Sequence, residues 1–335
     1  MRKLIDYINE RKDFVLRKLY KKASVKNKKR IFFVFLIFVS RKIDRLLIKA
    51  YKEIKRKLRY IYKRITKKEL KLLVYSAWRL GDEITILPAY KAIKMKYPDA
   101  EIDVVCNYPE LIKDLTFINP VKKFSENNYD LIIRLNDENP RLTRWENIER
   151  KIGVKINTYP EIKIERKPEN NLIGISIGAG WKCKRWPVEY FEKLVEYLEK
   201  EGVEVWVFGL PSEKINRGKD FTGNSLKKCI ENLKKCSLFI GNDSGLLHLS
   251  LAIGIPSIGL FGPTLPEKLY NNNPLLYPIK SKIECQGCWN RRLMKYPGIC
   301  PYGIPECMEK IKVEDVIKIV EFLMNKNKGI GKDGF

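Results

Sequence analysis

Apolar residues between positions 238 and 261 alternate between runs typical of strands and spacings typical of a helix. Residues 238–240 form a short apolar run that ends in turn formers, which predicts a strand followed by a turn. Apolar residues then fill a short helix that begins at Ser244 and is closed by Gly254. Because a second apolar run follows at once in 257–261, the pattern predicts an α/β unit.

The turn before this helix has the chemistry of a phosphate site. A strand that turns through glycine into a helix brings free backbone N–H groups and the positive end of the helix dipole to one place. Ser244 and Gly245 lie at that place. The local pattern also allows a structural interpretation, in which Asp243 caps the helix and His248, the only histidine of the chain, packs in the core.

A βαβ unit is predicted where the globular part begins, near residue 71. Residues 72–76 form an apolar run, and the turn after it ends in Gly81-Asp82. Apolar residues then recur at helical spacing through 84–95, followed by a further strand in 101–106. A third strand is expected in 130–135, and the segment 136–167 is polar. Asp82 has a structural interpretation as the N-cap of the helix.

A second α/β unit is predicted to begin at a buried strand in 172–177. A glycine-rich turn leads to the string Lys-Arg-Trp-Pro at 184–187, and the proline suits the first turn of the next helix. Taken alone, Lys184 could be a solvated lysine beside a buried Trp186. The strand 203–208 and a turn that contains Glu213 follow, and a last amphipathic helix is expected at 313–324.

Three motifs, in this order, resemble glycosyltransferase family 9, the ADP-heptose:lipopolysaccharide heptosyltransferases. They are Gly81-Asp82 with Pro88, the Lys-Arg-Trp-Pro string at 184–187, and the run GNDSGLLHL followed by LFGPT between 241 and 264. The resemblance covers about residues 71–325. It implies the α/β architecture called GT-B, in which two Rossmann-like domains face a cleft.

The composition of the chain and this resemblance together predict three segments, of which only the second and third rest on the resemblance. Residues 1–70 form a basic amphipathic helical extension, 71–165 an abbreviated N-terminal Rossmann-like acceptor domain, and 170–328 a C-terminal Rossmann-like domain for the nucleotide sugar. The linker is placed at 161–171, where polar residues and prolines gather. The first domain has only about a hundred residues, so the identity of the acceptor is the least determined part of this prediction.

The resemblance also implies roles for particular residues. Asp82 matches the proposed general base, and a cleft carboxylate can take the proton of an attacking hydroxyl in an inverting displacement. Lys184 matches a lysine that contacts the donor phosphates, where a fixed cation stabilises the charge of the leaving nucleoside diphosphate. Other residues are expected in the donor site: Glu213 at the ribose, Ser244 and Gly245 at the diphosphate, and Asp243 and His248 orienting the donor sugar or the loop.

The predicted function is transfer of a sugar, heptose-like, from a nucleotide donor, an ADP-sugar, to a hydroxyl of a glycan or lipid-linked glycan. The chain contains no Asp-x-Asp string, so no metal is expected in catalysis. No cofactor is expected besides the nucleotide sugar, which is the substrate. Two alternatives from other classes stay open: a nucleotide-sugar epimerase with the same fold, and a non-catalytic protein that binds a membrane surface.

Charge is concentrated in the first 70 residues. They contain 25 Lys and Arg against 6 Asp and Glu, a net of +19 out of +26 for the chain. The apolar run at 31–39 is shorter than the roughly 20 residues of a membrane span, and no secretory signal is recognised. Mixed apolar and basic residues favour an anionic membrane surface as the partner, with the enzyme attached peripherally on the cytoplasmic side. A nucleic-acid arm is not expected, and a coiled-coil or partner-binding helix pair is the other alternative.

Four of the eight cysteines lie close together near the C-terminus. They are Cys285, Cys288, Cys300 and Cys307. The first two have the spacing of a zinc knuckle, but the spacing of the second pair is looser than usual. A structural zinc, disulfides and reduced thiols therefore remain three open interpretations.

Overall fold

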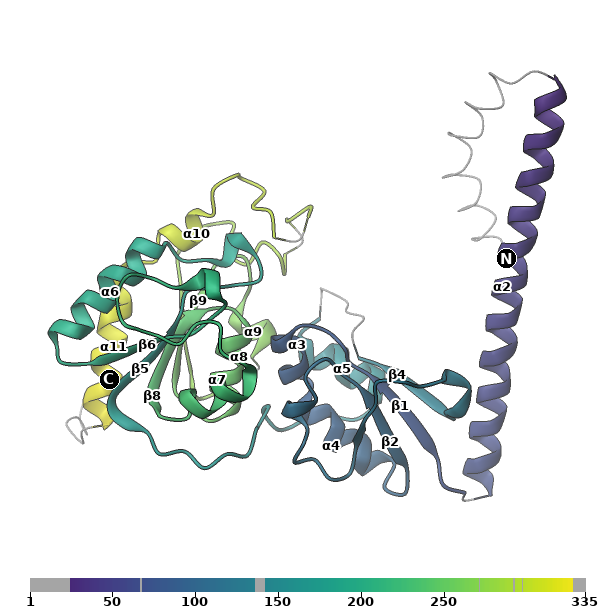
Figure 1. Ribbon diagram of the computed structural model, residues 1–335, viewed down its shortest axis with the longest axis horizontal. Coiled ribbons are helices and arrows are strands. Elements are labelled where there is room, and N and C mark those ends of the chain that lie inside the picture. Colours follow the sequence, from purple (N-terminus) through teal and green to yellow (C-terminus); the bar gives the residue numbers. More distant parts are fainter. Residues whose placement is uncertain are drawn as a thin grey trace. The chain divides into compact units, whose positions relative to one another are not determined.

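The computed structural model describes residues 25–66, 68–135, 142–270, 272–291, 293–296 and 298–327, and of these it leaves out the side chains of 25–44, 144, 326 and 327 (Figure 1). The chain divides into two units, Met1–Lys68 and Glu69–Phe335. The first is dominated by one helix, and the second contains two parallel sheets with their helices. The two units are described separately below.

Helix α2 runs from Val25 to Ile65 and contains the apolar run at 31–39. From residue 45 onward its apolar side chains are exposed, and many recur at intervals of four and three residues: Leu47, Tyr51, Ile54, Leu58, Ile61 and Ile65. This spacing places them on one face, between lysines and arginines. In the described part of the chain no helix is long and apolar enough to cross a membrane. Residues 1–24 of the expected amphipathic extension lie outside the described residues.

The N-terminal lobe of the second unit is built on a four-stranded parallel sheet of order β3-β2-β1-β4. Its strands are β1 Lys71–Tyr75, β2 Glu101–Val105, β3 Asn119–Pro120 and β4 Leu131–Arg134. Its helices are α3 Leu80–Thr85, α4 Leu87–Lys96 and α5 Arg144–Ile152, with short 3-10 turns at Pro109–Leu111 and Glu126–Asn128. The centre of β1 is fully buried, as its apolar run predicted.

The C-terminal lobe is built on a six-stranded parallel sheet of order β10-β9-β8-β5-β6-β7. Its strands are β5 Glu169–Ser176, β6 Glu204–Val207, β7 Lys219–Asp220, β8 Cys236–Asn242, β9 Ser257–Phe261 and β10 Leu276–Lys280. Its helices are α6 Val188–Lys200, α7 Leu226–Leu233, α8 Gly245–Ala252, α9 Pro266–Leu269, α10 Glu306–Glu309 and α11 Val313–Asn327, with 3-10 turns η3 Lys182–Lys184 and η4 Pro211–Glu213. The second unit therefore has the α/β architecture that the sequence predicted.

The prediction of a single helix between 84 and 95 is wrong in one respect. The structure has two helices there, α3 and α4, which are separated at Ile86. Pro88 has no N–H and cannot donate to the carbonyl of Ile84, so a continuous helix would leave that carbonyl without its partner. Pro88 instead lies in the first turn of α4, where a missing N–H costs little.

Helix α5 lies inside the segment that sequence analysis described only as polar. Thr143 caps it by accepting from the Glu146 N–H, while the Glu146 carboxylate accepts from the Thr143 N–H at 2.6 Å. Trp145, Ile148 and Ile152 recur at helical spacing and are buried. These two signals, a capping box and a short apolar stripe, were present in the sequence.

The core of the C-terminal lobe lies between its sheet and the pair of helices α6 and α11, which pack against each other (Figure 1). Trp186 is almost fully buried there, and its indole N–H donates to the Ile311 carbonyl at 2.9 Å. Its backbone N–H donates to the Asn242 side chain at 2.9 Å. These bonds fix the chain just after Lys184 against the end of β8.

Candidate active site

The predicted donor-site residues gather at the carboxyl ends of the parallel strands of the C-terminal lobe. Lys184 follows β5, Glu213 follows β6, and Asp243 follows β8. Strands of one parallel sheet end at the same edge, which is where open α/β sheets bind ligands. Topology therefore brings together residues that lie far apart in the sequence.

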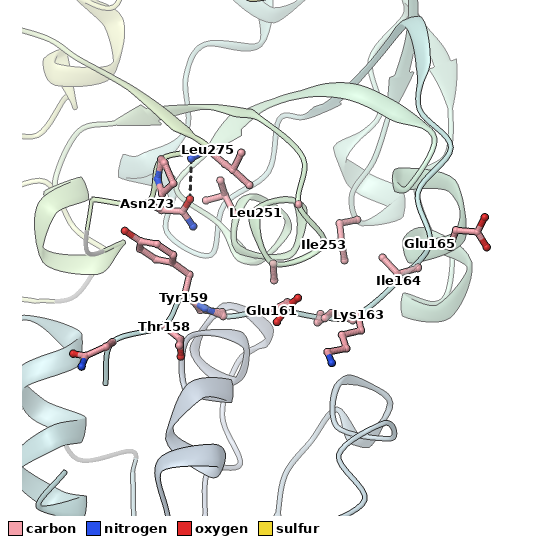
Figure 2. Close-up of a pocket in the computed structure, with 16 residues that line it drawn as sticks. Thr158, Tyr159, Glu161, Lys163, Ile164, Glu165, Leu251, Ile253, Asn273 and Leu275 are labelled. Carbon is pink, nitrogen blue, oxygen red and sulfur yellow. Dashed lines mark hydrogen bonds between the residues drawn. The ribbon is translucent and has the colours of Figure 1, made fainter. Parts of the chain in front are cut away.

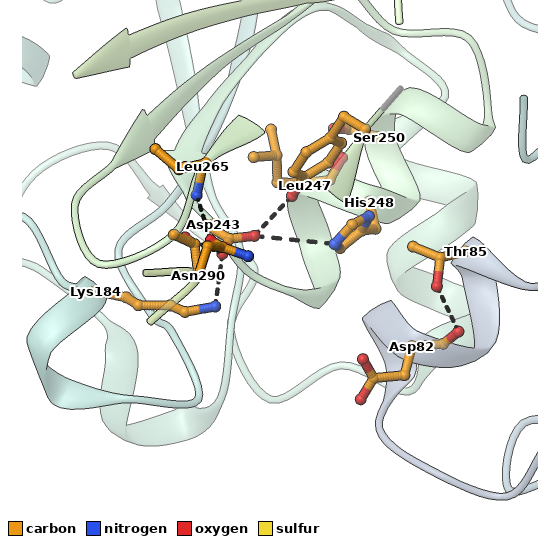
Figure 3. A network of polar contacts seen from close by, with 11 residues as sticks. Asp82, Thr85, Lys184, Asp243, Leu247, His248, Ser250, Leu265 and Asn290 are labelled. Atoms are coloured by element: carbon orange, nitrogen blue, oxygen red, sulfur yellow. Dashed lines mark hydrogen bonds and ion pairs between the residues drawn. The ribbon is translucent and has the colours of Figure 1, made fainter. Parts of the chain in front are cut away.

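Asp243 is the centre of a buried polar network (Figure 3). Its carboxylate accepts a hydrogen bond from the Lys184 ammonium at 2.6 Å. It also accepts from the Thr264 hydroxyl at 2.7 Å and from the Tyr270 hydroxyl at 2.8 Å. Every donor reaches the carboxylate from a different part of the chain. Asp243 therefore links the loop before α6 with the segments that follow β9.

The pKa of Asp243 reflects these partners. Burial by itself raises the pKa, but the charges of Lys184 and His248 and the bonds from Lys184 and Thr264 lower it to about 2. The carboxylate is therefore ionised at neutral pH although the side chain is only 3% exposed. A buried carboxylate needs this compensation, because an isolated buried charge is strongly unfavourable.

His248 lies beside Asp243 and does not pack as an isolated core residue. Its Nε2 atom is 3.9 Å from the nearer carboxylate oxygen of Asp243. Its ring stacks on Tyr270, with 4.3 Å between the ring centres and 9° between the planes. The interpretation of Asp243 as a simple helix cap is also wrong, because Ser244 is the N-cap of α8 and the Asp243 carboxylate bonds to Lys184, Thr264 and Tyr270.

The amino-terminal end of α8 has an unused polar atom. Ser244 makes no side-chain capping bond, and its hydroxyl oxygen is buried without a hydrogen-bond partner among the described residues. Gly245 is the first residue of the helix, and it lies against α3 of the other lobe. A helix amino terminus with free N–H groups is suited to an anion.

Helix α3 carries Asp82 to this place. A Cβ atom on Gly81 would lie 2.8 Å from Cδ2 of His248 and 3.3 Å from the Cα of Gly245, so α3 and α8 touch where both residues are glycines. Asp82 is half-buried and is the third residue of α3, after Leu80 and Gly81. Its interpretation as the N-cap is therefore wrong, because Arg79 occupies that position. Figure 3 shows Asp82 on α3 beside α8.

Glu83, which sequence analysis did not select, holds the loop before α3, the helix that carries Asp82. Its buried carboxylate accepts from the backbone N–H groups of Trp78 at 3.0 Å, Asn107 at 2.7 Å and Tyr108 at 3.0 Å. The Asn107 side chain in turn donates to the Trp78 carbonyl at 2.7 Å. Burial raises the pKa of Glu83, although the three N–H donors oppose that rise. Only its position next to Asp82 could have drawn attention to it.

Glu213 is buried between two glycines at the strand ends. A Cβ atom on Gly178 would lie 2.1 Å from its carboxylate, and one on Gly209 would lie 2.6 Å from it. The carboxylate accepts from the Leu210 N–H at 2.9 Å and is 3.9 Å from the Arg185 guanidinium. Glycine is therefore required at both positions for Glu213 to reach this strand end.

Thr264 and Tyr270 complete the network but were not predicted as site residues. Thr264 ends the LFGPT run, so its neighbourhood was recognised although its own contact was not. Tyr270 follows α9 and reaches Asp243 across 27 positions of sequence. No local pattern in the sequence indicates that contact.

All eight cysteines lie in the described part of the chain, and all are free. Cys183 and Cys288 form a small buried cluster with Met294, against which Cys300 packs. Burial raises the pKa of Cys288 to about 11 and that of Cys307 to about 12, so these thiols stay protonated at neutral pH. Within the described ranges, no group of three or more His, Cys, Asp or Glu residues is arranged to hold a metal ion.

A separate groove of about 920 Å³ follows the segment that joins the lobes (Figure 2). It is lined by residues 157–165, by 251–254 at the end of α8, and by 273–275. None of the predicted site residues lines it. Since Ser244 is at the other end of α8, this groove is distinct from the Asp243 network.

Comparison with known proteins agrees with the family resemblance of the motifs at 184–187 and 241–264, both of which lie inside the matched residues. Residues 157–295 match the model of the family described as Glycosyltransferase family 9 (heptosyltransferase). The chain is 32% identical over 115 residues to lipooligosaccharide heptosyltransferase 2 of Haemophilus influenzae. This match covers 30% of this chain and 33% of that protein. The chain is also 26% identical over 176 residues to lipooligosaccharide heptosyltransferase 2 of Campylobacter jejuni. This second match covers 47% of this chain and 52% of that protein. The chain thus spans about a third to a half of the length of these relatives.

The fold is similar to that of a solved enzyme, the dodecameric iron-containing heptosyltransferase TibC of Escherichia coli in complex with ADP-D-beta-D-heptose. The TM-score is 0.68 at 16% identity, and the match covers 77% of this chain and 76% of TibC. At this identity the likeness shows the fold alone. The GT-B-type fold that the sequence predicted is therefore confirmed, and the match of residues 157–295 bears out the resemblance to family 9.

Proposed function

We propose that this chain is a glycosyltransferase that moves a sugar, heptose-like, from an ADP-sugar to a hydroxyl of a glycan or lipid-linked glycan. The observation that carries the proposal is the contact of Gly81 with Gly245, which brings the helix of Asp82 to the amino terminus of α8. The match of residues 157–295 to family 9 and the ADP-heptose complex of TibC support a heptose donor. The similarity to lipooligosaccharide heptosyltransferases supports a lipooligosaccharide-type acceptor.

The donor diphosphate is assigned to the space between Lys184 and the start of α8. Lys184 uses one donor on Asp243, and an ammonium group has three. Its remaining donors, the free N–H groups of α8 and the Ser244 hydroxyl would bind the phosphate oxygens. As the bond between the anomeric carbon and the phosphate oxygen breaks, the added charge on that oxygen is stabilised by these groups.

Asp82 is assigned as the general base. In an inverting displacement the acceptor oxygen forms a bond to the anomeric carbon as the diphosphate leaves from the opposite face. The acceptor proton passes to the Asp82 carboxylate, and the electron pair of the broken bond leaves with the diphosphate. Glu83 acts through Asp82 as a positioning residue, because its bonds to Trp78, Asn107 and Tyr108 fix the loop before α3.

The remaining residues orient the donor. Asp243 fixes Lys184 and Tyr270, and Tyr270 supports the ring of His248. His248 then presents its imidazole edge to the donor sugar or holds the loop at the start of α8. Glu213, at the end of β6, is assigned to the ribose hydroxyls, which carboxylates at strand ends bind in nucleotide folds.

Attachment to an anionic membrane surface is assigned to the first unit. Net charge of +19 in residues 1–70 and the exposed apolar face of α2 supply Coulomb attraction and apolar burial. The attachment is assigned as peripheral and to the cytoplasmic side of the membrane.

The proposal is tested by a transfer assay with ADP-heptose and a lipid-linked core acceptor, measuring both ADP release and labelled glycolipid. Asp82→Asn should lower turnover about 100-fold or more while leaving the Kd for ADP nearly unchanged. Asp99→Asn, at an exposed carboxylate after α4, is the matched control and should keep full turnover. Unchanged turnover in Asp82→Asn would remove Asp82 from the mechanism.

A further inference from the structure

We infer that Arg79 is a phosphate-binding residue that the N-terminal lobe contributes to the donor side of the site. This inference rests on the proposed function and adds to it a cation that no motif indicated. Arg79 directly precedes α3, three positions before Asp82. Because Arg79 and Asp82 lie in the same lobe, this position links phosphate binding at the C-terminal lobe to the proposed base in the N-terminal lobe.

The guanidinium of Arg79 lies against the turn that leads to Lys184. A Cβ atom on Gly180 would be 3.0 Å from Nη1 of Arg79 and 4.0 Å from its Cζ. Gly180 belongs to the turn between β5 and η3, the 3-10 turn that ends at Lys184. A larger residue at 180 would meet the guanidinium, so glycine keeps this approach open.

The same turn has a second guanidinium on it. Arg185 donates from Nε and Nη2 to the Ala179 carbonyl, at 3.1 and 2.9 Å. With Lys182 and Lys184, this turn and Arg79 therefore gather four cationic side chains from two lobes. The nearby carboxylates of Asp243 and Glu213 are ionic or hydrogen-bonding partners of Lys184 and Arg185, and neither contacts Arg79.

Arg79 differs from its neighbours because its charge is uncompensated. Among the residues that the structure describes, no hydrogen bond or ion pair involves its guanidinium, and the side chain is exposed. Its backbone is nevertheless held, since its carbonyl accepts from the Glu83 N–H at 3.0 Å and the adjacent Trp78 N–H donates to the Glu83 carboxylate. A fixed backbone with a free planar fork of donors is suited to bidentate contact with a phosphate.

Two phosphates could occupy this position: the diphosphate of the donor, or a phosphate group on the acceptor. Both present the same chemistry to the guanidinium. A donor phosphate would share Arg79 with Lys184, whereas an acceptor phosphate would bind after the nucleotide. The two sources therefore differ in whether ADP and a second phosphate compete.

The test is calorimetry on the full chain and on Arg79→Ala, Arg79→Lys and Lys182→Ala. Lys182 is an exposed cation of the same turn and serves as the matched control for loss of one charge. Each protein is titrated with ADP and with adenosine, and the ADP-saturated protein is then titrated with inorganic phosphate. Thermal melting of each variant verifies that the fold is intact.

If Arg79 binds the donor, Arg79→Ala should raise the Kd for ADP about tenfold or more and leave adenosine unaffected, as expected for a lost charge-assisted bond. If it binds the acceptor, ADP affinity stays unchanged and phosphate binding to the ADP-saturated protein is lost in Arg79→Ala. Arg79→Lys should be intermediate in either case, because the charge stays and the fork is lost.

The inference is overturned if Arg79→Ala matches the unsubstituted chain in all three titrations, or if Lys182→Ala loses as much affinity. Failure of the proposed function would look different, because the unsubstituted chain would then bind no ADP. In that case phosphate titrated into the nucleotide-free chain decides the matter: equal binding with and without Arg79 contradicts the inference, and loss in Arg79→Ala supports it.

Discussion

Gly81 of α3 and Gly245 of α8 face each other without side chains between them. A Cβ atom on Gly81 would be 3.3 Å from the Cα of Gly245, and one on Gly245 would be 3.3 Å from the Gly81 nitrogen. Gly81 belongs to the first motif and Gly245 to the third. Gly81 is the second residue of α3, and Gly245 is the first residue of α8. The contact thus explains physically why both motifs contain glycine at the point where the two lobes meet.

The first prediction follows from this contact. In a free helix Gly81→Ala would be stabilising by about 1 kcal/mol, because alanine has the higher helix propensity. Here the added methyl would lie 2.8 Å from His248 Cδ2, so we expect a net loss of about 1 to 3 kcal/mol in unfolding free energy and reduced turnover. Urea unfolding of Gly81→Ala measures the stability directly.

A double variant provides the control for that prediction. His248→Ala removes the side chain that the new methyl would meet, so it should recover part of the stability lost in Gly81→Ala. This double-mutant cycle isolates the pair. Stabilisation by Gly81→Ala alone would mean that α3 and α8 do not approach as closely as the structure has them.

The second prediction concerns Lys184. Lys184→Ala should weaken ADP binding about tenfold or more and leave adenosine binding almost unchanged, because only the diphosphate presents charge to the ammonium. Calorimetry with both ligands measures the difference. Lys184→Arg keeps a cation next to Asp243 and is the matched variant, for which a smaller loss is expected. Equal losses for ADP and adenosine would place Lys184 outside the phosphate site.

The third prediction uses the pKa of Asp243, which is lowered from its ordinary 3.8 to about 2. A carboxyl with a lowered folded-state pKa adds stability above its unfolded pKa, and that stability is lost as the pH falls toward the folded one. We therefore expect Asp243 to contribute about 2 kcal/mol above pH 5, decreasing below pH 4. Urea unfolding of the unsubstituted chain and of Asp243→Asn across pH 3 to 7 measures it. A constant difference between them at all pH values would contradict the prediction.

The fourth prediction concerns α2 and the anionic membrane surface. Deleting residues 1–68 should release the chain from anionic vesicles without changing the Kd for ADP, since these residues form a unit separate from Glu69–Phe335. In the full chain, replacing Leu47, Ile54, Leu58 and Ile61 by Gln should weaken sedimentation with vesicles, because the apolar contribution is lost.

Salt distinguishes the two forces in that experiment. Moderate salt should weaken binding of the full chain only in part, because screening removes Coulomb attraction and leaves apolar burial. Complete release by salt, or continued binding of the truncated chain, would contradict the membrane assignment. Unchanged vesicle binding with a loss of self-association in the Gln variant would favour the helix-pair alternative.

The sequence by itself determined the α/β class, most strands and the positions of the three motifs. Short apolar runs such as 72–76 and 257–261 are buried strands because a parallel sheet is covered on both faces, which leaves few polar positions in them. The start of the second run was marked by Gly254, whose φ of 81° few other residues adopt, and by Pro256. Even α5 was indicated by local residues, through its capping box and apolar stripe, although we described that segment only as polar.

Only the tertiary structure decided which side chains meet. Tyr270 and Thr264 reach Asp243, and Glu83 collects the N–H groups of Asn107 and Tyr108, because the sheet order brings distant loops to one edge. Local pattern cannot encode such contacts, since it depends on neighbours within one or two turns of chain. The placement of Arg79 against Gly180 is of the same kind: it depends on two lobes packing through α3 and α8, and no spacing within either motif specifies it.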